Sequence, residues 1–310
     1  NEAKEICLKI LDEQPNNSNF LHLLGAITFE EKNYQKSEEI ISKVIKLKPK
    51  QAEIYSLYAL ILFNLKKFDL AIKSWEEVIK LKPNHAEAYN NRGNILFLLE
   101  KNVAAIESYK KAIEIKSDYA DAYNNLGNPL WKQKKITESI ENYKKALEIQ
   151  PNHPEAHNNL GMAFHKLKKN EDAIKSYDAA INFKPDYAEA HYNKANLLFE
   201  IEKIDACLQS YDTAIKFKPN YAEAYFNRGS VFLAANANVE ALENFKKVLE
   251  IKPDFEVLSG ILLYTKLKLC DWKNFDEDLE NLKKEANDFT KKPNPYPLLF
   301  SYDSLKVQKL

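Results

Sequence analysis

Five asparagines recur at intervals of 34 residues, and this spacing makes them the polar side chains best suited to a repeated binding chemistry. They are Asn91, Asn125, Asn159, Asn193 and Asn227. A neutral amide offers two N–H donors and a carbonyl acceptor, so it can pair with the main chain of an extended peptide. Each such hydrogen bond contributes only on the order of 1 kcal/mol, so several must act together. We therefore predict a ladder of peptide-binding asparagines; the alternative is that they satisfy neighbouring helix backbones or descend from duplication of one unit.

A second register of the same period carries mostly aromatic side chains. Its members that could line the peptide-binding surface are Phe63, Phe97, Trp131 and Phe199. We number the positions of each 34-residue unit from 1, and the first unit begins at Ser18. In this numbering the aromatic residues are at position 12, which helical spacing places on the same helix face as positions 5 and 9. Rings there could anchor apolar groups of a bound peptide. The alternative, which we favour, is that the rings pack between adjacent helices.

The histidines and carboxylates show no spacing typical of a catalytic or metal site. His153 and His157 are four residues apart, but His153 lies before Pro154, which begins a predicted helix. His157 and His191 occupy position 4, where other units have tyrosine, so we interpret them as packing residues. There is no Cys–His metal motif, glycine-rich phosphate loop or nucleophile elbow. We predict no catalytic residue, no metal ligand and no cofactor in this chain.

The charge balance argues against several classes of partner. The chain has 310 residues, with 45 acidic and 45 basic side chains and a formal net charge of zero. Only Arg92 and Arg228 are arginines, whereas a nucleic-acid partner requires a concentrated basic face. The three cysteines are widely spaced, which fits reduced intracellular thiols better than disulfides. No apolar run approaches the roughly 18 residues of a membrane span, so we predict no membrane partner and a cytoplasmic location.

Prolines mark the period of the chain. They stand at residues 15, 49, 83, 151, 185, 219 and 253, with Ser117 in the remaining place of the series. A 34-residue unit closed by proline resembles the tetratricopeptide repeat, which is a helix–turn–helix. The resemblance implies an all-α fold, namely a right-handed superhelical solenoid whose groove is lined by the first helices of the repeats. The repeats then begin at Ser18, Ala52, Ala86, Ala120, Pro154, Ala188 and Ala222.

This register divides the chain into four parts. Residues 1–17 form a half repeat with a second helix only, and residues 18–255 form seven full repeats. Residues 256–289 lose the pattern and form degenerate capping or junction helices, one of them beginning at Trp272 with Asp271 as its cap. Residues 290–310 form a proline-rich segment with an apolar stretch. Because the chain begins with Asn1 and a half repeat, we expect it to be a fragment of a longer protein.

Small and large side chains alternate in the predicted helix pairs. Glycine occupies position 8 in five repeats, and Trp, Tyr or Phe occupies position 24 in six. A small residue facing a large one lets the two helices of a repeat approach closely. Pro129 stands inside the first helix of the fourth repeat, where it removes the hydrogen bond to the carbonyl of Asn125. We therefore predict a kink in that helix.

The residues that follow the last regular repeat resemble a more specific family. Cys270–Trp272 with Phe275, then "NPYPLL" and "SYDSLKVQ", after an array that carries asparagines, resemble peptide O-GlcNAc transferases, in particular bacterial and plant Spindly-type members. The resemblance implies a C-terminal catalytic domain of two Rossmann-like lobes beyond residue 310, with a UDP-sugar, UDP-GlcNAc, as the donor. It also implies that the asparagine ladder holds acceptor proteins whose Ser or Thr hydroxyls receive the sugar.

The leading interpretation is thus a non-catalytic, acceptor-binding repeat region of a protein O-glycosyltransferase. The alternative is a free-standing scaffold or adaptor for protein–protein interaction without enzymatic activity. Arrays of this repeat that clamp the tails of chaperones resemble one another in having lysine at position 5. No repeat of this chain has lysine there, which counts against such a clamp. A nucleic-acid-binding helical repeat is disfavoured by the zero net charge.

Overall fold

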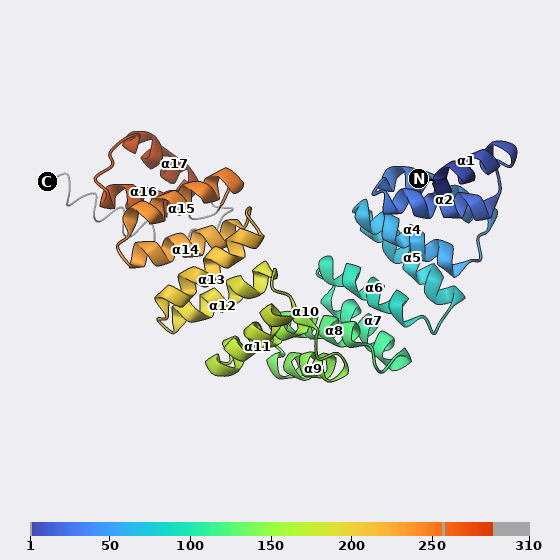
Figure 1. Cartoon of the computed structure of the whole chain (residues 1–310), viewed down its shortest axis with the longest axis horizontal. Helices are drawn as coiled ribbons and strands as arrows, with labels where there is room; N and C mark the ends of the chain where they lie inside the picture. The colour runs from blue at the N-terminus through green and yellow to red at the C-terminus, as the bar shows by residue number, and fades with distance from the viewer. Residues whose placement is uncertain (1, 256–257, 288–310) are drawn as a thin grey trace. The chain divides into compact units, whose positions relative to one another are not determined.

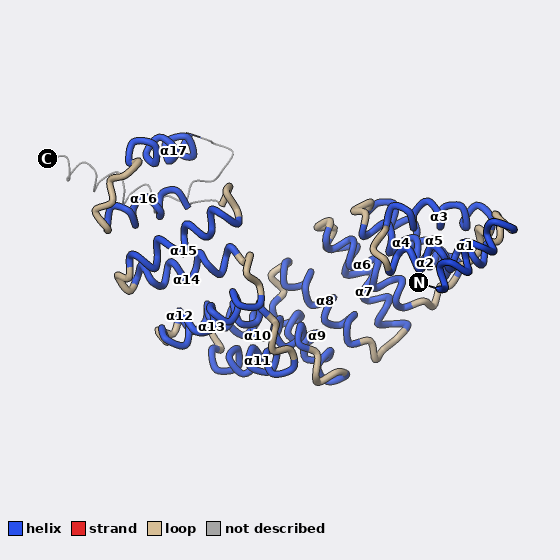
Figure 2. The backbone as a smooth tube through the Cα atoms, turned by 45° about the horizontal axis from the view of Figure 1, so that its top comes forward, coloured by secondary structure: helices blue, strands red, loops and turns tan. Residues whose placement is uncertain are grey.

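The computed structural model describes residues 2–255 and 258–287, and the secondary-structure elements of these residues are all helices joined by short turns (Figures 1 and 2). The prediction of an all-α fold is confirmed. The first helices of the repeats are α2 (Ser18–Glu30), α4 (Ala52–Asn64), α6 (Ala86–Leu98), α8 (Ala120–Lys132), α10 (Pro154–Lys166), α12 (Ala188–Glu200) and α14 (Ala222–Ala234). The second helices are α3 (Tyr34–Leu47), α5 (Phe68–Leu81), α7 (Asn102–Ile115), α9 (Ile136–Ile149), α11 (Asn170–Phe183), α13 (Ile204–Phe217) and α15 (Asn238–Ile251). They are flanked by α1 (Glu2–Glu13), α16 (Leu258–Lys268) and α17 (Phe275–Asn287).

The described residues form two compact units, which divide between residues 163 and 164. In the first unit, α2, α4, α6 and α8 each pack against the second helix of their own repeat, and α3, α5 and α7 each pack against the next first helix. First helices also contact one another, α2 with α4 and α6 with α8. The second unit repeats this arrangement, with α12 in contact with α13 and with α14. In both units, neighbouring first helices therefore lie side by side, as these three pairs show.

The core of each repeat depends on the pairing of position 8 with position 24. A Cβ added to Gly93 would lie 2.6 Å from Cε1 of Tyr109, and one added to Gly127 would lie 2.3 Å from Cε1 of Tyr143. Both rings are fully buried. In the second unit Gly229 faces Phe245 at 2.8 Å. Because no side chain fits in this space, the glycine is required for the close approach of the two helices.

The turn inside every repeat uses one residue in the left-handed backbone region. Position 15 has a positive φ in each of the seven repeats, at Lys32, Lys66, Glu100, Lys134, Lys168, Glu202 and Asn236. At the end of α4, Lys66 N–H donates to the Phe63 carbonyl (2.9 Å) and Lys67 N–H donates to the Leu62 carbonyl (2.8 Å). These are the two hydrogen bonds of a Schellman motif, which satisfies the last carbonyls of a helix.

The same turn recurs after α16, one period beyond the last regular repeat. Cys270 has φ 55°, and it lies 34 residues after Asn236. Its N–H donates to the Leu267 carbonyl (3.0 Å), and Asp271 N–H donates to the Lys266 carbonyl (2.9 Å). The backbone therefore keeps the repeat geometry through α16 and its turn, although the side-chain pattern has already changed.

Two details differ from the sequence prediction. The last described helix begins at Phe275 and not at Trp272, because Asn274 has φ 59° and a helix cannot continue through that conformation. The Asp271 carboxylate instead accepts a hydrogen bond from Lys273 N–H (3.1 Å) within the preceding turn. Pro129 lies buried inside α8, and the kink that we predict there stays a prediction. The proline-rich segment 290–310 lies outside the described residues.

Candidate functional site

The five predicted ladder asparagines all lie on first helices, at position 6 of α6, α8, α10, α12 and α14. Each of them is half-buried: Asn91, Asn125, Asn159, Asn193 and Asn227. Because first helices contact one another within each unit, the asparagines of one unit follow the row of first helices. They are therefore neither core residues nor fully solvated ones.

In the first unit, the amide nitrogens of the ladder join one repeat to the next. Asn125 Nδ2 donates to Asn90 Oδ1 of the preceding repeat (3.1 Å). Asn159 Nδ2 donates to Asn124 Oδ1 (2.9 Å) and to Asn128 Oδ1 (3.2 Å). Asn90 and Asn124 are at position 5 and are buried, and Asn128 is at position 9. The ladder therefore has a structural role between side chains of adjacent repeats, and not between a side chain and a helix backbone as the alternative interpretation supposed.

The second unit contains the same connection. Asn227 Nδ2 donates to Tyr192 Oη (3.0 Å) and to Asn196 Oδ1 (2.9 Å). Asn196 Oδ1 also accepts a hydrogen bond from the buried Tyr211 hydroxyl (2.5 Å). The position-9 asparagine therefore links the core of its own repeat to the ladder residue of the next repeat.

Sequence reasoning missed the acceptors of these hydrogen bonds. They are the asparagines and the tyrosine at positions 5 and 9: Asn90, Asn124, Asn128, Tyr192 and Asn196. The signal was present in the sequence, because asparagine recurs at position 5 in three consecutive repeats and at position 9 in three repeats. What the sequence did not show is that position 6 of one repeat reaches positions 5 and 9 of the preceding one.

Asn91 is the first member of the ladder and differs from those that follow it. The repeat before it has Ser56 and Leu60 at positions 5 and 9. Consistent with this, the Asn91 side chain makes no hydrogen bond within the described part of the chain, so both its donors and its acceptor are available. Oδ1 of Asn159 likewise accepts no hydrogen bond from the described residues. In the first unit the ladder therefore offers amide oxygens at Asn91 and Asn159, whereas Asn125 Oδ1 accepts a hydrogen bond from Asn124 Nδ2 (3.4 Å).

The face of the first helices is apolar before it becomes rich in amides. Position 6, which carries the ladder asparagines in later repeats, is Leu23 in α2 and Leu57 in α4, and Leu23 is 47 % exposed. Leu60 and Phe63 of α4 are also exposed. The side chains on this face consequently change from apolar to polar at α6, where Asn91 is the first asparagine at position 6.

The predicted aromatic residues are partly packed and partly accessible. Phe63 and Phe199 are 40 % and 38 % exposed, whereas Phe97 and Trp131 are half-buried. The Phe63 ring lies 5.9 Å from the ring of Phe68 on the second helix of its own repeat. The Lys132 ammonium lies over the Phe97 ring at 5.4 Å. Phe63 and Phe97 thus each have one side in contact with a neighbouring side chain, and Phe63 and Phe199 have surface that a ligand could reach.

The histidines act at the ends of helices. His153 is buried, its Nδ1 accepts a hydrogen bond from Ala156 N–H (3.4 Å), and its Nε2 lies 3.2 Å from Asp121 Oδ1. The hydrogen bond with His153 lowers the pKa of the Asp121 carboxyl. His157 Nε2 donates to the carbonyl of Pro151 (2.8 Å), which ties α10 to the loop before it. Within residues 2–255 and 258–287, no group of three or more His, Cys, Asp or Glu side chains is arranged to hold a metal ion.

None of the described helices combines the length and the apolar composition that crossing a bilayer requires.

Two solved structures resemble the fold over most of the chain. The first is a chain of the Cut9–Hcn1 hetero-tetramer of APC/C, with 18 % sequence identity and a TM-score of 0.67, covering 84 % of this chain and 52 % of that one. The present chain thus spans about half the length of that neighbour. The second is PilF of Pseudomonas aeruginosa, with 17 % identity and a TM-score of 0.57, covering 65 % of this chain and 92 % of that one. At these identities the similarity concerns the fold alone.

Sequence comparison identifies the repeat itself. A search of curated proteins finds no relative that matches. A family model described as "TPR repeat" matches residues 59–100, 93–134, 130–168, 162–202 and 195–236, and a second, described as "Tetratricopeptide repeat", matches residues 222–255. The first model alone covers more than half of the chain, in the register in which the helices pair. The predicted tetratricopeptide solenoid is therefore confirmed, and this chain belongs to the tetratricopeptide-repeat family.

Proposed function

We propose that the chain is a scaffold that binds polypeptides on the face that the first helices form in each unit. The observation that carries this proposal is the row of half-buried asparagines, in which Asn91 and Asn159 each keep an amide oxygen that accepts no hydrogen bond from the described residues. An amide oxygen accepts a main-chain N–H of any residue type. Binding by such a row is tolerant of the sequence of the bound polypeptide.

The hydrogen bonds between repeats make the ladder suitable for binding. Asn159 is held at two acceptors, Asn124 and Asn128, so its amide plane is oriented before a ligand arrives. A side chain that is already ordered loses little rotamer entropy on binding. The structural role and the binding role of the ladder are thus compatible, because they use different atoms of the same amide.

Asn91 allows this proposal to be tested with little effect on folding. Because its side chain has no hydrogen-bond partner among the described residues, Asn91→Ala removes a ligand contact and no contact between repeats. We expect the affinity for a labelled pool of tyrosine-free extended peptides to fall about fivefold, which corresponds to one hydrogen bond of about 1 kcal/mol. The melting temperature should stay within a degree or two of the parent value.

The matched control is Asn84→Ala, since Asn84 is an exposed asparagine in the loop between α5 and α6. This variant should bind the peptide pool like the parent. Equal affinities of Asn91→Ala and Asn84→Ala would remove Asn91 from the binding surface.

We further propose that the bound polypeptides are acceptor proteins of an O-glycosyltransferase that uses UDP-GlcNAc and carries this array. The support is the likeness of Cys270–Trp272, Phe275 and residues 290–310 to peptide O-GlcNAc transferases. In the described part of this segment, Trp272 is 52 % exposed and its ring meets that of Phe275 edge-on at 5.6 Å. The family models and the solved structures reported above point to the repeat and not to a glycosyltransferase.

The intact mass of the native gene product separates this proposal from its alternative, a free-standing adaptor. A product whose mass exceeds 35.9 kDa by that of a further catalytic domain, and that transfers label from UDP-GlcNAc to protein hydroxyls, would support a glycosyltransferase. A product near that mass that transfers no sugar would support the free-standing adaptor instead.

A further inference from the structure

The residue directly before each first helix follows a rule that one repeat breaks. This residue is position 34, and from the second repeat onward it is always a ring: His85, Tyr119, His153, Tyr187, Tyr221 and Phe255. In the first repeat the corresponding residue is Gln51. The exception therefore stands at the junction of α2, α3 and α4.

In other repeats, the ring at position 34 packs on the residue at position 5 of the same repeat. The Tyr119 hydroxyl is hydrogen-bonded to the side chain of Asn90, and burial raises the pKa of Tyr119 to about 12. In the second unit the rings of Tyr221 and Tyr192 are 4.9 Å apart. The rings of Phe255 and Phe226 are 5.0 Å apart. The space between position 34 and position 5 is thus a slot for an aromatic ring.

A lysine at position 31 covers the outer side of this slot in several repeats. Lys116 Nζ lies 5.0 Å from the centre of the Tyr119 ring, and Lys218 Nζ lies 4.2 Å from that of Tyr221. Such cation–π contacts favour an electron-rich ring in the slot. In the first repeat, which lacks the ring, Lys48 donates instead to Asn19 Oδ1 (2.8 Å).

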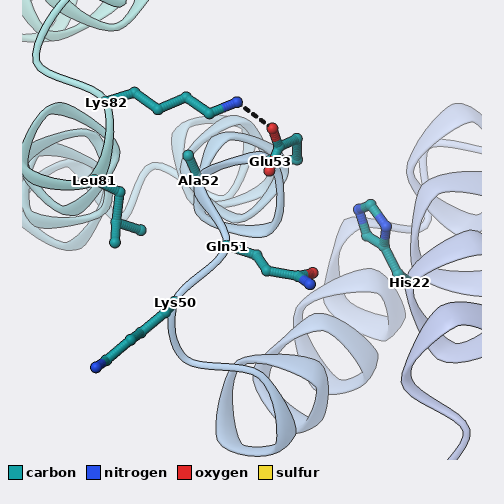
Figure 3. Close-up of a pocket in the computed structure, with 7 residues that line it drawn as sticks. All are labelled: His22, Lys50, Gln51, Ala52, Glu53, Leu81 and Lys82. Carbon is teal, nitrogen blue, oxygen red and sulfur yellow. Dashed lines mark hydrogen bonds and ion pairs between the residues drawn. The ribbon is translucent and has the colours of Figure 1, made fainter.

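The first repeat has a cavity of about 400 Å³ where the other repeats have the ring. Its lining residues are His22, Lys50, Gln51, Ala52, Glu53, Leu81 and Lys82. His22 is at position 5, and Figure 3 shows the amide of Gln51 directed toward its imidazole, with the Lys50 side chain directed away. Gln51 does not cap α4. Neither His22 nor Gln51 has a side-chain hydrogen bond within the described residues, so both can serve a ligand.

We propose that this cavity receives a tyrosine side chain of a bound polypeptide, which occupies the slot that the chain's own ring fills in the other repeats. The apolar surface of Ala52 and Leu81 suits the faces of the ring, and the polar tips of His22 and Gln51 suit its hydroxyl. A pocket that combines apolar walls with a few polar groups is typical of specific recognition of one side chain.

The charges around the cavity agree with a neutral, polar ligand group. Burial lowers the pKa of His22, so its imidazole is neutral at pH 7 and can accept the hydrogen of a phenol. Glu53 and Lys82 form an ion pair with each other, as Figure 3 shows. Because these two charges are paired and the Lys50 ammonium is directed away from the cavity, the charges around it do not select a carboxylate or an ammonium group instead.

This inference rests on the proposed function in one respect only: the tyrosine belongs to a bound polypeptide. The slot lies at the end of the first-helix row that precedes the ladder, since His22 is on α2 and the ladder begins on α6. A tyrosine seated there would fix the register of a polypeptide that the asparagines bind without regard to sequence.

The test uses the full chain and N-acetyl-tyrosinamide as the probe, with binding followed by saturation-transfer NMR and by the shift of the His22 imidazole signals. A ligand of this size is expected to bind with a dissociation constant on the order of 1 mM. The decisive variant is Gln51→Tyr, which gives the first repeat its own ring. It should abolish probe binding and raise the melting temperature by a few degrees.

Gln51→Ser is the matched control, because it leaves the slot open, and it should bind the probe like the parent. N-acetyl-leucinamide should not bind to any of the three proteins. No binding of the tyrosine probe to the parent, or undiminished binding to Gln51→Tyr, would overturn the inference. A melting temperature of Gln51→Tyr below that of the parent would also overturn it, because the cavity would not then be the ring slot.

The two proposals fail separately. The probe contains a single residue and cannot span the ladder, whereas the peptides that test the ladder contain no tyrosine. If the parent binds the tyrosine-free peptides but not the probe, the tyrosine slot alone is removed; if the parent binds the probe but Asn91→Ala binds the tyrosine-free peptides as well as the parent does, the ladder alone is removed.

Discussion

Single residues in this chain are constrained chiefly by contacts between small and large side chains and by shared amides. Gly127 faces Tyr143, whose hydroxyl donates to Asn128 Oδ1 (3.0 Å), and Asn128 also accepts from Asn159. One glycine, one ring and two amides thus form a connected set that spans two repeats. The sequence predicted the glycine–ring contact, because both residues keep the 34-residue period. It did not predict the shared amide, because that contact depends on how one repeat packs on the next.

Gly127→Ala should destabilise the chain by about 1–3 kcal/mol, because the new methyl group would lie 2.3 Å from a buried ring that is held by its own hydrogen bond. Urea unfolding followed by circular dichroism measures the loss. Combining Gly127→Ala with Tyr143→Leu makes room for the methyl group. The double variant should therefore be more stable than the sum of the two single losses. Strict additivity would mean that the methyl group does not meet the ring.

Asp121 gives a prediction for the dependence of stability on pH. Its carboxyl has a lowered pKa because of the hydrogen bond with His153. A carboxyl whose pKa is lower in the folded state stabilises the fold above its unfolded pKa, and this contribution is lost as the pH falls through the folded value. Asp121→Asn should thus show a smaller fall in melting temperature between pH 6 and pH 3 than the parent does. Parallel curves for the two proteins would show that the contact with His153 contributes nothing.

At the scale of helices and turns, the period predicts where each first helix begins, since Ser18, Ala52 and Ala86 open α2, α4 and α6 as expected. The left-handed residue at position 15 could not be predicted, because it is lysine, glutamate or asparagine and never glycine. Two hydrogen bonds per turn hold this conformation in place of the usual glycine preference. The prediction that the last helix begins at Trp272 was wrong for the same reason. Asn274 has a left-handed backbone, and the sequence alone does not distinguish such an asparagine from a helical one.

The turn residues predict a stabilising substitution. Lys134 has φ 63°, a conformation that costs an L residue roughly 1–2 kcal/mol and glycine almost nothing. After the entropy cost of glycine, Lys134→Gly should raise the free energy of unfolding by about 0.5–1 kcal/mol. Lys110→Gly is the control, because Lys110 is exposed inside α7 and glycine in a helix interior should destabilise. An equal effect of the two changes would contradict this account of the turn.

At the scale of the whole molecule, the chain consists of two units of stacked repeats with one face of first helices in each. The fold class was predictable, because the period, the glycines and the large residues all agree in register. The surface was predictable only in part. The asparagine ladder is visible in the sequence. The cavity beside His22 could not be predicted in the same way, because it follows from the lack of an aromatic side chain at position 51. Only the structure shows that the rings at this position in other repeats contact position 5.

The most direct test of polypeptide binding by the ladder is a calorimetric titration of one tyrosine-free extended peptide into three proteins: the parent, Asn91→Ala, and the double variant Asn91→Ala/Asn159→Ala. Asn91 and Asn159 both lie in the first unit, on α6 and α10. If each asparagine contributes one hydrogen bond, the affinity should fall in two steps of about fivefold each while far-ultraviolet circular dichroism shows that all three proteins remain folded. Equal affinities of the three folded proteins would contradict the central claim.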